Sequence, residues 1–231
     1  MQKQNRLYNK DILPVSRTKD EAKQFYNRIS RVYGYLTGPF ERKYAERAVR
    51  NLSVQEGETV LEIGFGPGYC LRQIAESVGK TGKAYGIDIS SGMLEVARRR
   101  LEKAGLIDRV ELYCGDAANT PYSDNTFDAV FMSYTLELFD TPEIPVVLQE
   151  VKRVLKPDGR LGIAGMSKAN GNSKFLKLYE WLHQKWPKYF DCRPIYVEQS
   201  IEDSGYKIVE KEKVKLLGIL PIEIVVAMKA G

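Results

Sequence analysis

Residues 60–69 read Val60-Leu61-Glu62-Ile63-Gly64-Phe65-Gly66-Pro67-Gly68-Tyr69, an apolar run that ends in three glycines spaced two residues apart. The apolar run is typical of a buried strand, and a helical pattern over 70–78 follows it directly. Glycines at such a junction let the backbone turn sharply and approach a ligand closely, while the following helix directs its amino end to the same place. The stretch therefore predicts a small-molecule site at the carboxyl end of a first strand.

From Thr59 onward the chain alternates short apolar runs with longer helical patterns, which is typical of βαβ units and a parallel sheet. Strands are expected over 59–63, 83–88, 109–113, 127–132 and 159–165. Helices are expected over 70–78, over 91–104 with a serine cap at Ser90 or Ser91, and over about 143–155, where the turn 156–159 ends the last one. Two closing apolar runs, 206–214 and 219–228, predict a hairpin. We expect one α/β domain with a doubly wound sheet.

The segments around this core differ from it in pattern. Residues 1–50 are mostly helical in pattern and form an expected cap, and the cofactor-binding core is expected over 51–167. Residues 168–193 break the alternation with aromatic and lysine side chains, among them Tyr189 and Phe190, and are expected to form a cap insertion after the fifth strand. Residues 194–231 complete the domain with a helix and the hairpin.

Charge is distributed unevenly along the chain. The 231 residues carry a net charge of +5, which is small for a protein that binds nucleic acid by charge alone. Residues 1–50 hold 12 basic and 5 acidic side chains, residues 168–193 hold 6 and 2, and the remainder holds 17 and 23. The two basic caps therefore flank an acidic core, and we expect them to meet an anionic substrate or a membrane surface.

The numbers of cysteine and histidine residues limit the disulfide and metal sites that the chain could form. Three cysteines and one histidine are too few for a disulfide framework or a multi-histidine metal site, so no metal and a reducing cytoplasm are expected. The amino-terminal residues lack the apolar core of a signal peptide, and the most apolar stretch, 216–228, is interrupted by Pro221 and Glu223. No membrane span is expected, while peripheral attachment stays open.

Two acidic residues follow the next two strands. Asp88 ends the second expected strand, 24 residues after Gly64, where a carboxylate accepts hydrogen bonds from ribose hydroxyls in nucleoside-binding sheets. Gly115-Asp116-Ala117 follows the third strand, where Asp116 is placed to accept from an exocyclic amine. A dinucleotide-binding loop would need its third glycine at position 69. Tyr69 occupies that position, so the spacing disfavours a pyrophosphate-containing ligand.

These three motifs in register resemble the class I S-adenosylmethionine-dependent methyltransferases over about 59–165. The resemblance implies S-adenosylmethionine as cofactor and a Rossmann-like, seven-stranded, mostly parallel sheet whose last hairpin supplies an antiparallel strand. In the resembling family the glycine loop lies under the methionine part, the Asp88 position holds the ribose, and Ile89 and Met93 pack on the adenine. The implied cofactor contacts are Glu62, Gly64, Phe65, Gly66, Gly68, Asp88, Ile89, Met93, Gly115, Asp116, Ala117, Ser133 and Tyr33.

A narrower resemblance is to the ubiquinone/menaquinone-biosynthesis methyltransferase group. It rests on Tyr26-Asn27-Arg28-Ile29-Ser30-Arg31-Val32-Tyr33 before the sheet and on Val154-Leu155-Lys156-Pro157-Asp158-Gly159-Arg160-Leu161. The resemblance implies a small or lipid-like acceptor, preferably a quinol-type carbon. Phospholipid-headgroup or other small-molecule N- or O-methylation is the alternative. An NAD(P)-dependent oxidoreductase and a non-catalytic nucleoside-binding module stay open as other classes, and the oligomeric state is undetermined.

Methyl transfer needs acceptor and methyl group held in line more than it needs covalent machinery. The candidate catalytic residues are Tyr134, Glu137 and His183, with Tyr33 as a further contact. Each has a structural alternative: a core aromatic for the tyrosines, a helix cap or ion pair for Glu137, and a solvated surface residue for His183. Ser133-Tyr134-Thr135-Leu136-Glu137 replaces the N/D-P-P-Y/F tetrapeptide of enzymes that methylate nucleic-acid amines, so no nucleic acid partner is expected.

Overall fold

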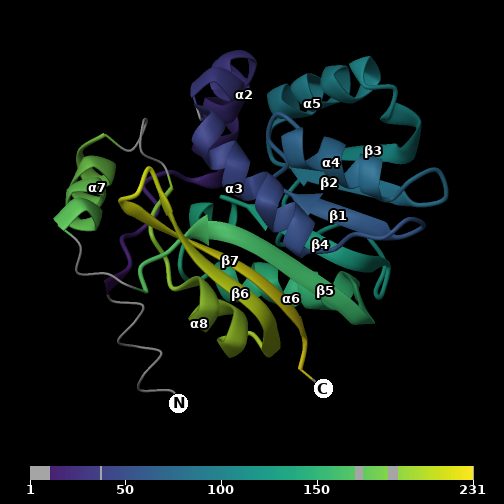
Figure 1. Ribbon diagram of the computed structural model, residues 1–231. Helices are drawn as coiled ribbons and strands as arrows, with labels where there is room; N and C mark the ends of the chain where they lie inside the picture. The colour runs from purple at the N-terminus through teal and green to yellow at the C-terminus, as the bar shows by residue number, and fades with distance from the viewer. Residues whose placement is uncertain (1–10, 37, 170–173, 187–191, 231) are drawn as a thin grey trace.

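The computed structural model describes residues 11–36, 38–169, 174–186 and 192–230, and the side chains of all of these except 35, 36 and 38–40. Figure 1 shows one twisted sheet with helices on both of its faces. The strands are β1 (Thr59–Ile63), β2 (Lys83–Asp88), β3 (Val110–Cys114), β4 (Phe127–Ser133), β5 (Leu155–Met166), β6 (Tyr206–Leu216) and β7 (Leu220–Lys229). Their order is β3-β2-β1-β4-β5-β7-β6.

The sheet has the expected class. Strands β1 to β5 pair in parallel, and β7 runs antiparallel between β5 and β6. The seven-stranded, mostly parallel, doubly wound architecture is therefore confirmed. The order reverses between β1 and β4, and in open α/β sheets ligands bind at the carboxyl ends of the strands beside this reversal.

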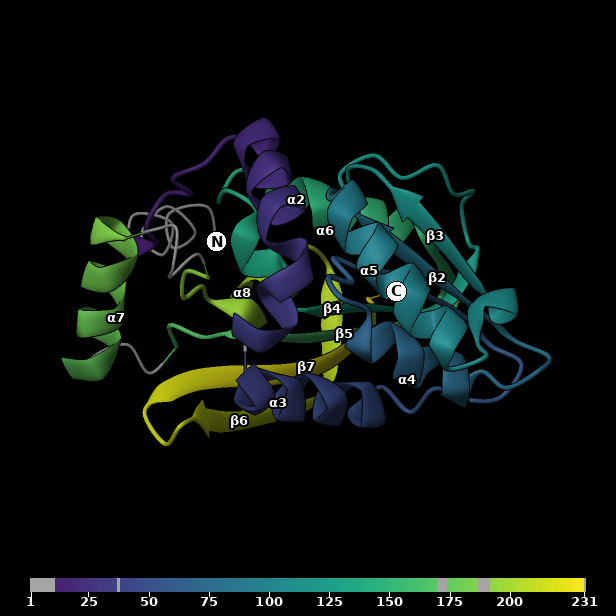
Figure 2. The same ribbon diagram turned by 90° about the horizontal axis from the view of Figure 1, so that it is seen from above.

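Helices bury both faces of the sheet in two apolar clusters. The helices are α2 (Lys19–Leu36), α3 (Gly38–Asn51), α4 (Tyr69–Ser77), α5 (Ser91–Lys103), α6 (Ile144–Val154), α7 (Lys174–Lys185) and α8 (Val197–Asp203), with short 3-10 turns η1 (Ile107–Arg109) and η2 (Leu136–Leu138). Helices α3, α4 and α5 pack on one face, and α6 and α8 on the other. In Figure 2, α2 and α3 lie along the near side of the sheet.

Local signals place the elements around the site. The Ser90 hydroxyl accepts a hydrogen bond from Met93 N at 3.1 Å, so the serine cap expected for α5 is confirmed. The fifth strand was expected from residue 159, but β5 begins at Leu155, because buried Leu155 pairs with Phe127 and a register shift follows. Pro157 lies in this irregular stretch, where a residue without an N–H is tolerated.

The capping segments are described in part. Helices α2 and α3 lie within or at the end of the expected amino-terminal cap, and α7 lies within the expected insertion. Tyr189 and Phe190 of that insertion lie outside the described residues. The exact limits of cap, core and insertion stay a prediction.

Candidate functional site

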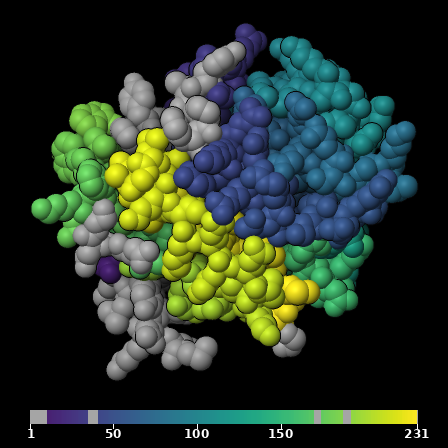
Figure 3. All heavy atoms as spheres, in the orientation of Figure 1, coloured from purple at the N-terminus to yellow at the C-terminus, as the bar shows by residue number. Residues whose placement is uncertain are grey.

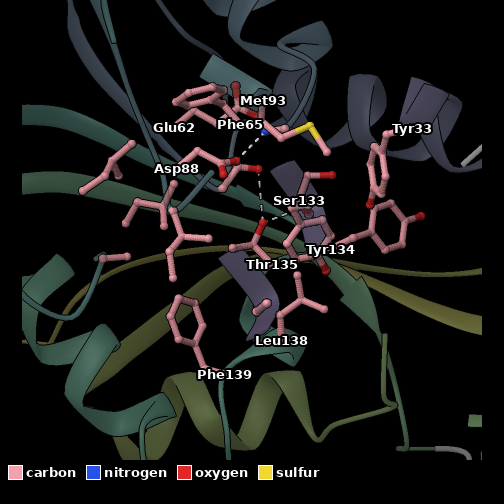
Figure 4. Close-up of a pocket in the computed structure, with 18 of the residues that line it drawn as sticks. Tyr33, Glu62, Phe65, Asp88, Met93, Ser133, Tyr134, Thr135, Leu138 and Phe139 are labelled. Atoms are coloured by element: carbon pink, nitrogen blue, oxygen red, sulfur yellow. Dashed lines mark hydrogen bonds between the residues drawn. The ribbon is translucent and has the colours of Figure 1, made fainter. Parts of the chain in front are cut away.

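A cavity of about 750 Å³ opens at the carboxyl ends of β1, β2, β3 and β4. The loops after these four strands form its floor, and α2, α3 and residues 15–19 form its cover. Its volume is in the range of pockets that bury a ligand of drug size, roughly 300–1,000 Å³. Figure 4 shows Glu62 and Asp88 on one side of this cavity, Tyr33 on the other and Tyr134 between them.

The glycine loop after β1 has the backbone that the sequence predicts. Gly64, Gly66 and Gly68 have φ angles of 69°, 49° and 79°, which side chains rarely adopt. A Cβ on Gly64 would lie 2.4 Å from Thr135, and one on Gly68 would lie 2.8 Å from the Cβ of Ala97. A Cβ on Gly66 would meet no protein atom within 4 Å. Gly66 therefore leaves a backbone-lined space at the cavity wall.

Two buried carboxyl groups face this space. Glu62 is 2% exposed, its Oε2 has no hydrogen-bond partner among the described residues, and burial followed by the charge of Asp88 raises its pKa. Asp88 accepts from Gly66 N at 2.9 Å and from Ser90 N at 2.8 Å. Burial outweighs these two hydrogen bonds and raises the pKa of Asp88 to about 6. A buried carboxylate with free acceptor capacity is a ready partner for a ligand's donors.

The acidic residue after β3 is held by the cap. Asp116 accepts from Lys19 Nζ at 2.7 Å and from Ala118 N at 2.9 Å, and Lys19 also pairs with Glu143 at 2.9 Å. Burial raises the pKa of Asp116, but the hydrogen bonds from Lys19 and Ala118 outweigh it and leave this pKa lowered. Lys19 thereby ties the start of α2 across the cavity mouth.

The opposite end of the cavity is aromatic. The rings of Tyr26 and Tyr33 meet edge to face with centroids 6.0 Å apart, and both line the cavity with Tyr134. Tyr134 has a φ of 50°, a strained value for a side chain of this size, and its N–H donates to Ala164 O at 2.8 Å. Its buried hydroxyl has no hydrogen-bond partner among the described residues, and burial, with Glu41 and Glu137 nearby, raises its pKa. Tyr134 therefore lines the cavity with a neutral side chain whose hydroxyl is buried in the wall.

The structure brings most of the predicted site residues together. Those that line the cavity are Tyr33, Glu62, Gly64, Phe65, Gly66, Asp88, Ile89, Met93, Gly115, Asp116, Ala117, Ser133 and Tyr134. Gly68, Glu137 and His183 are not among the lining residues. Gly68 instead lets α4 approach Ala97 of α5.

Two of the three catalytic candidates lie away from the cavity. Glu137 belongs to η2 and is fully buried, and its Oε1 accepts from Met166 N at 2.9 Å and supports the end of β5. His183 lies in α7 and is only 4% exposed, so the interpretation as a solvated surface histidine is wrong. Leu176 and His183 lie on the same face of α7, and the histidine is buried because this face is turned inward.

The residues that cover the cavity are not among those predicted from the sequence. Val15, Arg17, Thr18 and Lys19 line it, and Val15 N donates to Asp140 at 3.3 Å. Tyr69, which replaces the third glycine of a dinucleotide loop, also lines it, with Arg42 and Arg100 over its ring at 4.3 and 3.6 Å from the centroid. No local pattern marks these contacts because their partners lie far apart in the sequence.

Neither a cluster of metal-ligating side chains nor a membrane-spanning helix occurs among the described residues. No cluster of three or more histidine, cysteine or acidic side chains is arranged to hold a metal ion in this part of the chain. None of the helices described combines the length and apolarity needed to cross a bilayer.

Known proteins share both this sequence and this fold. Residues 60–159 match the model of the methyltransferase domain family. The 2-phytyl-1,4-naphtoquinone methyltransferase of Trichormus variabilis is 31% identical over 70% of this chain and 71% of its own. The demethylmenaquinone methyltransferase of Symbiobacterium thermophilum is 31% identical over 80% and 76%. A solved S-adenosylmethionine-dependent methyltransferase from Aquifex aeolicus aligns with a TM-score of 0.60 and 27% identity over 80% of this chain and 89% of its own.

The chain belongs to the S-adenosylmethionine-dependent methyltransferases.

The cavity of the methyltransferase fits this cofactor on grounds of its own chemistry. The unpartnered carboxylate oxygen of Glu62 matches the cofactor's ammonium, and Asp88 keeps acceptor capacity for hydroxyl donors. The open space over Gly66 admits the chain between them. The expected cofactor and the expected enzyme class are thus confirmed. The two alternatives, an NAD(P)-dependent oxidoreductase and a non-catalytic nucleoside-binding module, are not supported.

Proposed function

We propose that this methyltransferase transfers a methyl group from S-adenosylmethionine to a ring carbon of a prenylated quinol or a related lipid-like phenol. The observation that carries the proposal is the pairing of a cofactor-type carboxylate end with an aromatic end where the hydroxyl of Tyr134 has no hydrogen-bond partner among the described residues. The two curated relatives support it, since their names describe methylation of a phytyl naphthoquinone and of demethylmenaquinone.

The carboxylate end would hold the cofactor. Glu62 accepts from its ammonium group, Gly66 lets it approach the backbone, and Asp88 accepts from its ribose hydroxyls. Ile89 and Met93 pack on its adenine, and the backbone around Ala117 meets the adenine edge, because Lys19 already occupies the carboxylate of Asp116. When bound, the cofactor supplies an electrophilic methyl group for in-line displacement.

The aromatic end would hold the acceptor. Tyr26 and Tyr33 supply flat apolar surface for an aromatic ring, and the neutral hydroxyl of Tyr134 donates to a ring oxygen of the acceptor. A donor fixed at one oxygen sets which ring carbon faces the methyl group. Tyr134 therefore orients the acceptor, and it is not a general base because its pKa is raised.

A lipid-like acceptor resides in a bilayer, so the proposal includes peripheral contact with a membrane. The basic side chains of residues 168–193 support this contact. Glu137 and His183 are left out of the proposed chemistry because neither lines the cavity.

The experiment is methyl transfer from radiolabelled S-adenosylmethionine into a fractionated host extract. The proposal expects label in the lipid fraction, on a compound whose label resists acid and base as a C-methyl group does. Label in phospholipid headgroups would instead establish the alternative N- or O-methylation. Label only in RNA or protein would overturn the proposed acceptor class.

A further inference from the structure

Exposed apolar side chains gather at one end of the molecule. Among the described residues, ten large apolar side chains are exposed, and six of them lie on or beside α7 and in the β6–β7 turn. These six, together called the α7 patch, are Phe175, Leu178, Trp181, Trp186, Leu217 and Ile219, which are 39–59% exposed. Soluble proteins seldom cluster exposed side chains of this size unless the surface binds something.

The two segments of the α7 patch lie side by side. Helix α7 contacts β7, and Tyr179 of α7 belongs to the same apolar cluster as Leu216 and Leu220 at the two ends of the turn. Figure 1 and Figure 3 show α7, in green, next to the yellow tip of the hairpin at the surface. The rings of Trp181 and Trp186 meet edge to face with centroids 5.6 Å apart, so the two indoles form one continuous surface.

Lysines surround these apolar side chains. Lys174, Lys177 and Lys185 on α7 and Lys215 beside the turn are exposed, and no acidic side chain among the described residues forms an ion pair with any of them. In the amino-terminal cap, Lys19 pairs with Asp116 and Arg47 with Glu212, while other basic side chains, such as Arg28 and Lys43, are exposed and form no ion pair among the described residues. The α7 patch therefore combines exposed apolar side chains with lysines that have no ion-pair partner among the described residues.

No described residue of α7 or of the β6–β7 turn lines the cavity, but two hydrogen bonds lead from these elements towards its acceptor end. Tyr179 of α7 donates to Cys192 O at 2.9 Å, and Tyr44 donates to Lys215 O at 3.0 Å. Cys192 and Tyr44 pack against the same apolar cluster as Tyr134. One short series of contacts thus connects the exposed surface to the residue proposed to orient the acceptor.

We infer that the α7 patch docks on an anionic lipid bilayer, with the aromatic and aliphatic side chains inserted among the headgroups and the lysines on the lipid phosphates. Aromatic side chains favour the boundary between apolar and aqueous phases, and lysines next to them are drawn to anionic lipid. The inference rests on the proposed function in one respect, since docking there brings the acceptor end of the cavity towards a membrane-borne acceptor.

The two tryptophans make the docking directly observable, because Trp181 and Trp186 are the only two in the chain and both lie in the α7 patch. Vesicles of equal parts phosphatidylglycerol and phosphatidylcholine should shift the tryptophan emission to the blue, and brominated lipid should quench it. Vesicles of phosphatidylcholine alone, or 0.5 M salt, should weaken binding at least tenfold. Co-sedimentation with unchanged, unquenched tryptophan emission would place the membrane contact elsewhere and overturn the inference.

Substitutions inside and outside the α7 patch test whether vesicle binding depends on this surface. Trp181→Ser/Leu217→Ser should lower the vesicle partition coefficient at least tenfold, whereas Val146→Ser/Val209→Ser, at equally exposed apolar positions on α6 and β6, should leave it within twofold. Lys174→Gln/Lys177→Gln should reduce the salt dependence, and the exposed pair Lys80→Gln/Lys103→Gln should not. Equal losses in test and control variants would contradict the inference.

Two further outcomes distinguish the inference from its rivals. A concentration-dependent dimer without lipid, lost in Trp181→Ser/Leu217→Ser, would identify the surface as a contact between two copies and overturn membrane docking. Vesicle binding by a protein that methylates no quinol would refute the proposed function alone. Activity on a water-soluble quinol with no response of the tryptophans to vesicles would refute the docking alone.

Discussion

At the scale of single residues, Tyr134 is the side chain proposed to orient the methyl acceptor. Tyr134→Phe removes only a hydroxyl that has no partner among the described residues, so the free energy of unfolding should change little. The value of kcat/KM for the quinol should fall about tenfold, since a hydrogen bond to the acceptor is lost, while the Kd for S-adenosylmethionine stays constant.

Tyr122→Phe is the matched control for this change. Tyr122 also has a buried hydroxyl without a partner among the described residues, but it packs in the apolar cluster on the other face of the sheet. Steady-state kinetics should show no effect of Tyr122→Phe. An equal loss of activity in both variants, or none in Tyr134→Phe, would contradict the orienting role.

Asp88 gives cofactor binding a defined pH dependence. Its pKa is raised to about 6, so the carboxyl is ionised above this pH and protonated below it. Ribose hydroxyls donate to the ionised form, so the Kd for S-adenosylmethionine should be constant above about pH 7 and rise about tenfold per pH unit below 6. Calorimetric titrations between pH 5 and 8 measure this.

Asp88→Asn tests the assignment of that pH dependence. The variant should bind weakly and with the same Kd across the range, although Glu62 is still present. A pH dependence retained in Asp88→Asn would show that Glu62, whose pKa burial also raises, is the titrating group.

The glycine loop is the element that positions the cofactor. Gly66→Ala places a Cβ in open space at the cavity wall, with φ at 49°, so the Kd for S-adenosylmethionine should rise at least tenfold. Gly105→Ala has nearly the same backbone, with φ at 67° and no atom within 4 Å, but lies after α5. Both should lose roughly 1–2 kcal/mol of stability. Calorimetry should find weakened binding only in Gly66→Ala; parallel losses in both variants would contradict the cradle.

Arg193 joins three segments that no single element would hold. Its guanidinium is fully buried and donates to Leu13 O at 2.8 Å, Thr141 Oγ1 at 3.0 Å and Phe139 O. Arg193→Met should lower the free energy of unfolding by about 1–3 kcal/mol for each acceptor left unpaired. Urea unfolding measures this change. Arg99→Met, at an exposed position, should stay within about 0.5 kcal/mol. Equal costs would show that Arg193 does not hold these segments.

The elements that the sequence predicts best are those with local causes. The strand before Gly64, the serine cap of α5 and the acidic residues after β2 and β3 depend on neighbours a few residues away. The start of β5 was misplaced because Leu155 pairs with Phe127 across the sheet, a contact with no local pattern.

At the scale of the whole molecule, contacts between residues far apart in the sequence determine the cover of the cavity and the burial of Arg193. Lys19 meets Asp116 from 97 residues away and Arg193 meets Leu13 from 180. These contacts place the cavity cover and bury Arg193, and no spacing in the sequence predicts them. His183 was misjudged for the same reason, since its burial depends on how α7 packs.

The most direct test of the account is the position of the transferred carbon. The methyltransferase is incubated with S-adenosylmethionine carrying a ¹³C methyl group and a short-chain naphthoquinol, and the product is examined by ¹³C NMR. If the acceptor is methylated at carbon, the spectrum gains a methyl signal bonded to a ring carbon, and this signal is at least tenfold weaker with Gly66→Ala. A methyl ether signal, or cofactor binding without any methylated quinol, would contradict it.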